Sequence, residues 1–137
     1  MSNELPQGLV ETLGPSTTVA EAVDRLTAAI EGNEKLGLIA TVDHTKGAVK
    51  AGLELEPTVE VFFGNPAVGT PLMQLARTVA IDLPQKILVT QGDNGVRVLH
   101  NDPTYLASRH GIPADTPQLA MQAGALQNLA NVAAGIA

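Results

Sequence analysis

The stretch "QKILVTQGDNGVRVLH", residues 85–100, decides the fold class of this chain. Two runs rich in Ile, Val and Leu flank "GDNG", and the Asn94-Gly95 pair is a strong signal for a tight turn. The stretch therefore predicts a β-hairpin. Because a hairpin pairs its strands antiparallel, we expect a sheet that is mostly antiparallel.

Amphipathic helices are predicted on both sides of the hairpin. "TVAEAVDRLTAAIEG" (residues 18–32) opens with the spacing of a capping box, Thr18 and Glu21, in which each side chain binds the other residue's free backbone N–H. Gly32 is a plausible end of this helix. Asp102-Pro103 and Thr116-Pro117 have the pattern of helix starts, and the second of them begins a C-terminal helix within residues 113–137.

Three further strands are predicted before the hairpin, at residues 8–13, 36–42 and 58–63. In the second of them, Leu36, Leu38, Ala40 and Val42 alternate and should lie on one face. A short helix separates the last two strands, so the predicted order is β-α-β-(α)-β-α-β-β-α-α. This order predicts a single α+β domain over residues 1–137, with helices packed on one face of the sheet and disorder in residues 1–7.

The composition excludes several classes of function. The chain has 137 residues, a formal net charge of −6, no Cys and only three aromatic residues, Phe62, Phe63 and Tyr105. A basic surface with stacking rings is what nucleic-acid binding needs, and anionic membranes repel the same negative charge. Without Cys there is no disulfide framework, and no signal peptide or apolar span is recognisable. We expect a soluble cytoplasmic domain that binds neither nucleic acid nor membranes.

The stretch "FFGNPAVGTPLM" (residues 62–73) resembles a phosphate-binding loop because Gly64 and Gly69 have its spacing. The nucleotide motif continues with Lys, however, and here Thr70 and Pro71 follow instead. We therefore expect a strand, a turn with glycines at positive φ and a helix that begins at or near Thr70, without nucleotide affinity. The free N–H groups at such a helix start could still bind an anion.

Asp43-His44 closes a predicted strand just before a helix. Asp43 has the position of a helix cap, and a carboxylate beside an imidazole is also an acid/base pair. His44, His100 and His110 lack the spacing of a metal site, so we expect no metal. His110 ends a short helix, where a cation favours the helix dipole and where a catalytic group would be equally plausible. The candidates for catalysis are Asp43, His44 and His110, and no cofactor can be assigned.

The order of these motifs resembles the family called domain of unknown function 302 (DUF302), over residues 15–112. The resemblance rests on "TVDHTKGAVKAGLELEPTVEVFFGNPAVGTPLM", "IDLPQKILV" and "NDPTYLASRHGI". It implies a compact α+β domain, often dimeric, and it implies no activity, since none is established for the family.

The polar residues that match the family all lie at element ends, where binding groups are usually displayed. If the strands ending at Val42 and Phe63 are neighbours, Asp43, His44 and Asn65 should emerge on one edge of the sheet. We thus expect a small-molecule-binding or sensing site formed by Asp43, His44, Gly64, Asn65, Gly69 and Thr70. One alternative is an enzyme with His44 as general base and Asn65 as its orienting group, and another is a structural assembly module without a ligand.

The C-terminal helix predicts an oligomer. From Pro117 to Ala137 no side chain is charged, whereas a solvated helix face normally carries charges. Gln118, Gln122 and Gln127 supply neutral polarity that a second subunit could cover without stranding a charge. We expect a homodimer, with this helix or an exposed sheet face in the interface. A helix packed on its own sheet, with neutral polar residues outward, is the alternative.

Overall fold

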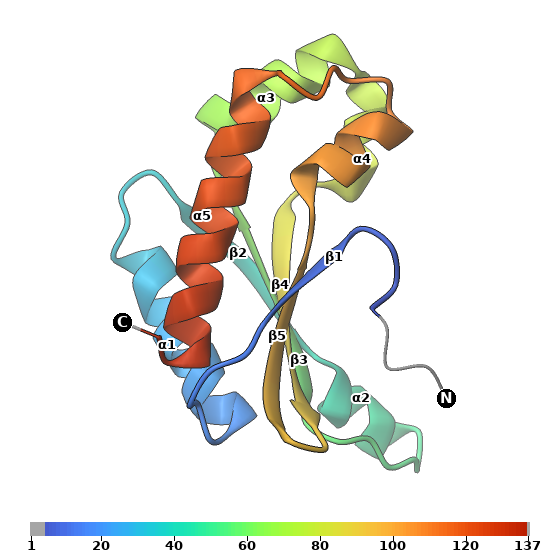
Figure 1. The fold of residues 1–137 in the computed structure, drawn as a ribbon. Coiled ribbons are helices and arrows are strands. Elements are labelled where there is room, and N and C mark those ends of the chain that lie inside the picture. The colour runs from blue at the N-terminus through green and yellow to red at the C-terminus, as the bar shows by residue number, and fades with distance from the viewer. Residues whose placement is uncertain (1–4, 137) are drawn as a thin grey trace.

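A computed structural model describes residues 5–136 and shows one five-stranded sheet in the order β1-β5-β4-β3-β2, with all neighbouring strands antiparallel (Figure 1). The strands are β1 (Leu9–Thr12), β2 (Gly37–Asp43), β3 (Thr58–Gly64), β4 (Gln85–Gly92) and β5 (Gly95–Asn101). The predicted α+β class, the antiparallel sheet and the order of elements are confirmed.

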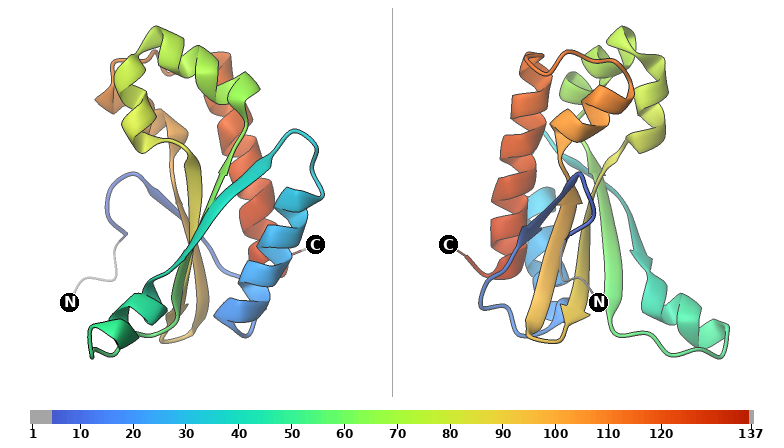
Figure 2. Two further views of the ribbon diagram at one scale, coloured as in Figure 1. Left: turned by 180° about the vertical axis from the view of Figure 1, so that it is seen from behind. Right: turned by 45° about the vertical axis from the view of Figure 1, so that its right-hand side comes forward.

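The helices gather in three places around the sheet. They are α1 (Val19–Glu31), α2 (His44–Lys50), α3 (Pro66–Leu75), the 3₁₀ helix η1 (Arg77–Asp82), α4 (Pro103–Arg109) and α5 (Pro117–Ala134). Figure 2 shows α1 and α5 on one face, α2 beyond one end of the sheet, and α3, η1 and α4 at the opposite end. Within residues 5–136, no helix has the length and apolar character needed to cross a membrane.

The hairpin that decides the fold forms as predicted. β4 and β5 pair from Ile87 opposite His100 to Gly92 opposite Gly95, which leaves Asp93 and Asn94 as the two-residue turn. Gly95 has φ +132°, a backbone conformation that other residues rarely adopt. The turn signal in the sequence therefore located the hairpin correctly.

Only one of the two hydrogen bonds of the predicted capping box forms at the start of α1. The Thr18 hydroxyl accepts a hydrogen bond from the Glu21 backbone N–H at 3.1 Å, as expected. The Glu21 carboxylate instead binds the Thr17 hydroxyl and the Arg25 guanidinium. These two interactions, the Thr17 bond first, lower the pKa of the Glu21 carboxyl. Thr18 alone thus caps the helix, and Glu21 is engaged on the outer surface.

The prediction that one face of β2 carries Leu36, Leu38, Ala40 and Val42 is wrong. Leu38 lies opposite Phe63 and Ala40 lies opposite Phe62, so the register shifts between them and Ile39 is the additional residue. Because successive side chains alternate, one extra residue moves everything beyond it to the other face. Leu38 consequently shares a face with buried Phe63, while Ala40 and Val42 share the face that α1 and α5 leave uncovered.

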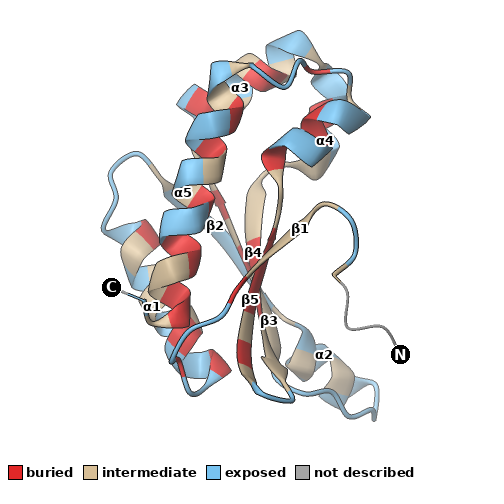
Figure 3. Ribbon diagram, in the orientation of Figure 1, coloured by how far each residue is buried: buried red, intermediate tan, exposed pale blue. Residues whose placement is uncertain are grey.

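Two apolar clusters form the core, as the buried residues in Figure 3 show. The larger joins α1 and the second half of α5 to the inner face of the sheet, around Leu26, Ile87 and Leu126. The smaller lies at the α3–α4 end, around Leu72 and Leu119. The helix α5 contributes to both clusters and so links the two ends of the molecule.

The C-terminal helix packs on its own sheet. Leu119, Leu126, Leu129 and Ala130 of α5 are buried, as is Gln122, which the sequence had suggested would be part of the outer polar face. Its bounds are narrower than the predicted 113–137 because Pro117 begins it and Gly135, at φ +84°, ends it. The predicted disorder of residues 1–7 falls largely on residues 1–4, which lie outside the described residues.

A close backbone contact fixes the end of α5 against the β1–α1 connection. The Ser16 N–H donates to the Ala134 carbonyl at 2.9 Å, and the Ser16 hydroxyl donates to the Ala133 carbonyl at 2.6 Å. A Cβ built on Gly14 would lie 2.4 Å from the Ala134 carbonyl oxygen. Only glycine therefore fits at position 14 without moving the backbone of α5.

We predict opposite stability changes for two glycine substitutions. Gly14→Ala should destabilise the fold by about 1–3 kcal/mol, because the new methyl group overpacks against a carbonyl. Gly124→Ala, inside α5 with no atom within 4 Å of the new methyl, should stabilise it by up to about 1 kcal/mol through helix propensity. Urea unfolding followed by circular dichroism measures both, and equal effects of the same sign would contradict the Gly14 contact.

Candidate functional site

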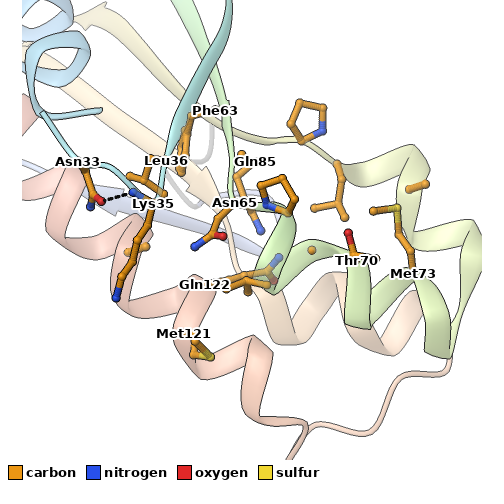
Figure 4. A pocket seen from close by; sticks show the side chains of 18 residues that line it. Asn33, Lys35, Leu36, Phe63, Asn65, Thr70, Met73, Gln85, Met121 and Gln122 are labelled. Atoms are coloured by element: carbon orange, nitrogen blue, oxygen red, sulfur yellow. Dashed lines mark hydrogen bonds between the residues drawn. The ribbon is translucent and has the colours of Figure 1, made fainter. Parts of the chain in front are cut away.

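A pocket of about 470 Å³ opens between the start of α3 and the first half of α5 (Figure 4). That volume lies within the range of about 300–1,000 Å³ typical of small-molecule sites. The wall is formed by the α1–β2 loop, the end of β3, α3, the η1–β4 connection and α5, through the residues Asn33, Lys35, Leu36, Phe63, Gly64, Asn65, Pro66, Val68, Gly69, Thr70, Met73, Ala80, Leu83, Pro84, Gln85, Met121, Gln122 and Ala125.

Most of this wall is apolar, and its polar groups are few. The amides of Asn65, Gln85 and Gln122 lie in one part of it (Figure 4). Among the described lining residues, Lys35 carries the only charge. Met73 and Met121 add flexible side chains that can adapt to a ligand's shape. The pocket therefore suits a mainly apolar molecule that is oriented by a small number of hydrogen bonds.

Four of the six predicted ligand-binding residues line this pocket: Gly64, Asn65, Gly69 and Thr70. The local geometry differs from the prediction, because α3 begins at Pro66 and Asn65, not Thr70, is its cap. Pro71, expected at the first helical position, lies inside the helix. Gly64 and Gly69 do not have positive φ, so their backbone conformation does not require glycine. A Cβ on Gly64 would lie 3.2 Å from Ile39 Cδ1, a tight contact, and one on Gly69 would lie 3.7 Å from Leu83 Cδ1, an ordinary one.

The start of α3 offers little to an anion. Pro66 has no N–H, the Ala67 N–H donates to Asn65 Oδ1 at 3.1 Å, and the Val68 and Gly69 N–H groups donate to the Asn65 carbonyl at 2.9 Å. The cap thus satisfies the groups that would have held a phosphate. The free N–H groups on which anion binding at this helix start would depend are therefore already paired.

Asp43 and His44 lie at the opposite end of the sheet. The pairing of β2 with β3 sets Gly37 opposite Gly64 and Asp43 opposite Val59, so the end of β2 is far along the strand from the end of β3. The expectation that Asp43, His44 and Asn65 form one site is therefore wrong, and so is the pairing of His44 with Asn65 in an enzyme. The C-termini of neighbouring antiparallel strands lie at opposite ends of the sheet, whereas those of neighbouring parallel strands lie at the same end.

Each of these two residues has a local partner. Asp43 Oδ1 accepts hydrogen bonds from the N–H groups of Thr45 and Lys46 at 3.0 and 3.2 Å, so it caps α2 as the sequence suggested. His44 Nε2 lies 3.4 Å from Glu60 Oε1, and nearly half of its side chain is exposed. Neither residue lines the 470 Å³ pocket.

His110 belongs to a separate polar cluster at the α3–α4 end. Its Nε2 lies 2.6 Å from Asp82 Oδ2 and its Nδ1 lies 2.8 Å from the Thr78 hydroxyl, while Arg109 binds the same carboxylate at 3.1 Å. A hydroxyl, an imidazole and a carboxylate in series resemble an activated nucleophile. The contacts join η1 to α4, and Thr78 is exposed on η1 and does not line the pocket.

Sequence reasoning missed Lys35, Gln85 and Gln122 as pocket residues. They come from a loop, a strand start and a helix, and only the packing of α5 over the end of β3 brings them together. No motif in the chain could have indicated them. The one available signal was the charge-free sequence of α5, which we had interpreted as an interface and which in part reflects the pocket wall. Within residues 5–136, no group of three acidic or His side chains is placed to hold a metal ion.

Comparisons with known proteins agree with this fold. The sequence profile of the family described as Domain of unknown function DUF302 matches residues 12–134. The crystal structure of the uncharacterized conserved protein DUF302 from Bacillus stearothermophilus superposes with a TM-score of 0.81 at 21% identity, covering 93% of this chain and 99% of that one.

Two curated relatives carry a different name. The chain is 39% identical over 127 residues to proteins named Fluoride-specific ion channel FluC 1 from Brucella suis biovar 1 and Brucella abortus biovar 1. The alignments cover 90% of this chain but only 49% and 46% of those proteins, so the chain spans about half the length of the curated relatives it matches. The match over residues 12–134 decides the assignment: the chain belongs to the DUF302 family.

Proposed function

We propose that this domain binds a small, mainly apolar molecule in the pocket between α3 and α5. The observation that carries the proposal is the 470 Å³ cavity, which has an apolar wall with a few convergent amides. Of the six residues that the sequence suggested, the proposed site keeps Gly64, Asn65, Gly69 and Thr70 and leaves out Asp43 and His44.

A polar side chain in the wall supports this assignment. Gln122 is only 8% exposed, and it lines the pocket. Its amide offers both a donor and an acceptor to a bound molecule that has a polar atom nearby.

Fluoride, the ion in the names of the Brucella relatives, is a poor fit for this pocket. A small, strongly hydrated anion needs a close cage of donors to replace its water, because burying an unpaired charge is very costly. The wall here is mostly apolar, and the volume of the pocket, about 470 Å³, is far larger than a single ion. The pocket therefore favours an organic molecule.

Filling the pocket should abolish binding. Nile red, a neutral apolar dye, is the probe, and its fluorescence reports transfer out of water. Ala125→Phe places a ring in the pocket wall on α5, and it should weaken dye binding by about 5- to 150-fold, since overpacking of that size costs about 1–3 kcal/mol. Ala120→Phe is the matched control, because Ala120 is exposed on the same helix and outside the pocket. Equal dye affinity for both variants would place binding elsewhere.

We also propose that the protein is a homodimer, with its interface on the β2–α2 side rather than on α5. The apolar residues of α5 are buried on its own sheet, whereas the segment from β2 through the loop after α2 exposes a run of large apolar side chains. They are Leu38, Ile39, Val42, Val49, Leu53 and Leu55. β2 is also an edge strand with free backbone groups, a ready partner for a second copy of itself.

Two equally exposed residues test this interface. Val49→Glu, at a position 71% exposed on α2, should shift the protein from dimer to monomer, because it would bury a charge against the partner. Ile81→Glu, at a position 73% exposed on η1, should leave the assembly unchanged. Sedimentation at micromolar concentration measures both variants, and a wild-type protein that sediments as a single 14.2 kDa species would contradict the dimer.

A further inference from the structure

We infer that the pocket's ligand is an amphiphile with an apolar body and one negatively charged, acceptor-rich head of the carboxylate type. This inference rests on the proposed function, because it specifies what the same pocket binds. Its basis is that Lys35 and Asn65 in the pocket wall both offer hydrogen-bond donors and so need acceptor atoms on the ligand. This observation does not depend on the volume of the pocket.

The charge around the pocket has one sign. Lys35 is the only charged residue among the described lining residues, although the whole chain has a net charge of −6. Within residues 5–136 the Lys35 ammonium is not part of any ion pair. Its loop is ordered by the Lys35 N–H, which donates to Asn33 Oδ1 at 3.0 Å. A free cation on an ordered loop beside an apolar pocket favours an anionic head at the same end.

The helix cap fixes Asn65 as a donor. Its Oδ1 already accepts from the Ala67 N–H at 3.1 Å, so the amide cannot rotate without breaking the cap, and both Nδ2 hydrogens remain for a ligand. Asn65 and Lys35 therefore both demand acceptor atoms. A carboxylate supplies two acceptor oxygens and a negative charge, whereas an ammonium head group would be repelled by the Lys35 ammonium.

The apolar body has a separate place. Leu36, Met73, Leu83 and Met121 contribute apolar surface to the wall, and the two methionines can adjust to chains of different shape. Figure 4 shows Met73, on α3, at the side of the pocket away from Lys35. An elongated amphiphile can thus set its head toward Lys35 and its tail toward Met73 on α3.

The test compares decanoate with decanol, which share one tail and differ in the charge of the head. Both are titrated by calorimetry into the wild-type protein and the Lys35→Gln variant, at a pH where the carboxylate is ionised. Lys35→Gln should weaken decanoate about two- to fivefold, the effect expected of an exposed ion pair, and leave decanol unchanged. Lys46→Gln, which removes a lysine from α2 at the other end of the sheet, should change neither affinity.

The outcomes separate the two claims. A Lys35→Gln variant that binds decanoate as tightly as the wild-type protein, or that loses decanol equally, overturns the inferred head group while decanol binding still supports an apolar pocket. If neither amphiphile nor Nile red binds, the proposed function is wrong, and the inference fails with it.

Discussion

The antiparallel pairing of β2 with β3 is the constraint on which the arrangement of this molecule depends. It sends the chain to one end of the sheet at Asp43 and back to the other end at Gly64. Whatever follows β2 must therefore lie far from whatever follows β3. The first connection becomes the projecting helix α2, and the second becomes the wall of the pocket.

The pocket lies where two cores approach without merging. The larger cluster ends near Phe63, and the smaller cluster begins near Leu72 and Met73. α5 crosses both, so its second half stabilises the sheet while Met121, Gln122 and Ala125 in its first half form the pocket wall. At its inward positions the lack of charge along α5 has two physical reasons, since one part is buried in the core and another faces an apolar cavity. A substitution in α5 can therefore change both the stability of the fold and the shape of the pocket.

Much of the fold was predictable from local signals. The turn between β4 and β5, the Thr18 cap and the Asp43 cap each depend on residues close in sequence, and each is present in the structure. The bulge at Ile39 was not predictable, because it satisfies the pairing with β3 and leaves no mark on the alternation of β2 itself. The cap of α3 was misplaced because Asn65-Pro66 and Thr70-Pro71 offer the same signal, and the earlier pair forms the helix start.

The site was half predictable for a related reason. Polar residues are often displayed at strand ends, and this rule located Asn65, Gly64 and Gly69. The directions of the strands decide which strand ends lie together, and the antiparallel pairing of β2 with β3 keeps His44 out of the pocket. Lys35 and Gln122 come from elements far apart in the chain, so only tertiary packing unites them with Asn65.

The most direct measurement is a two-dimensional ¹H–¹⁵N spectrum of the labelled protein during titration with decanol. The account predicts that backbone signals of Gly69, Gln122 and Ala125 shift, while those of Asp43, His44 and Thr45 stay in place. Shifts confined to the Asp43–His44 end, with Gly69 and Gln122 unchanged, would contradict it.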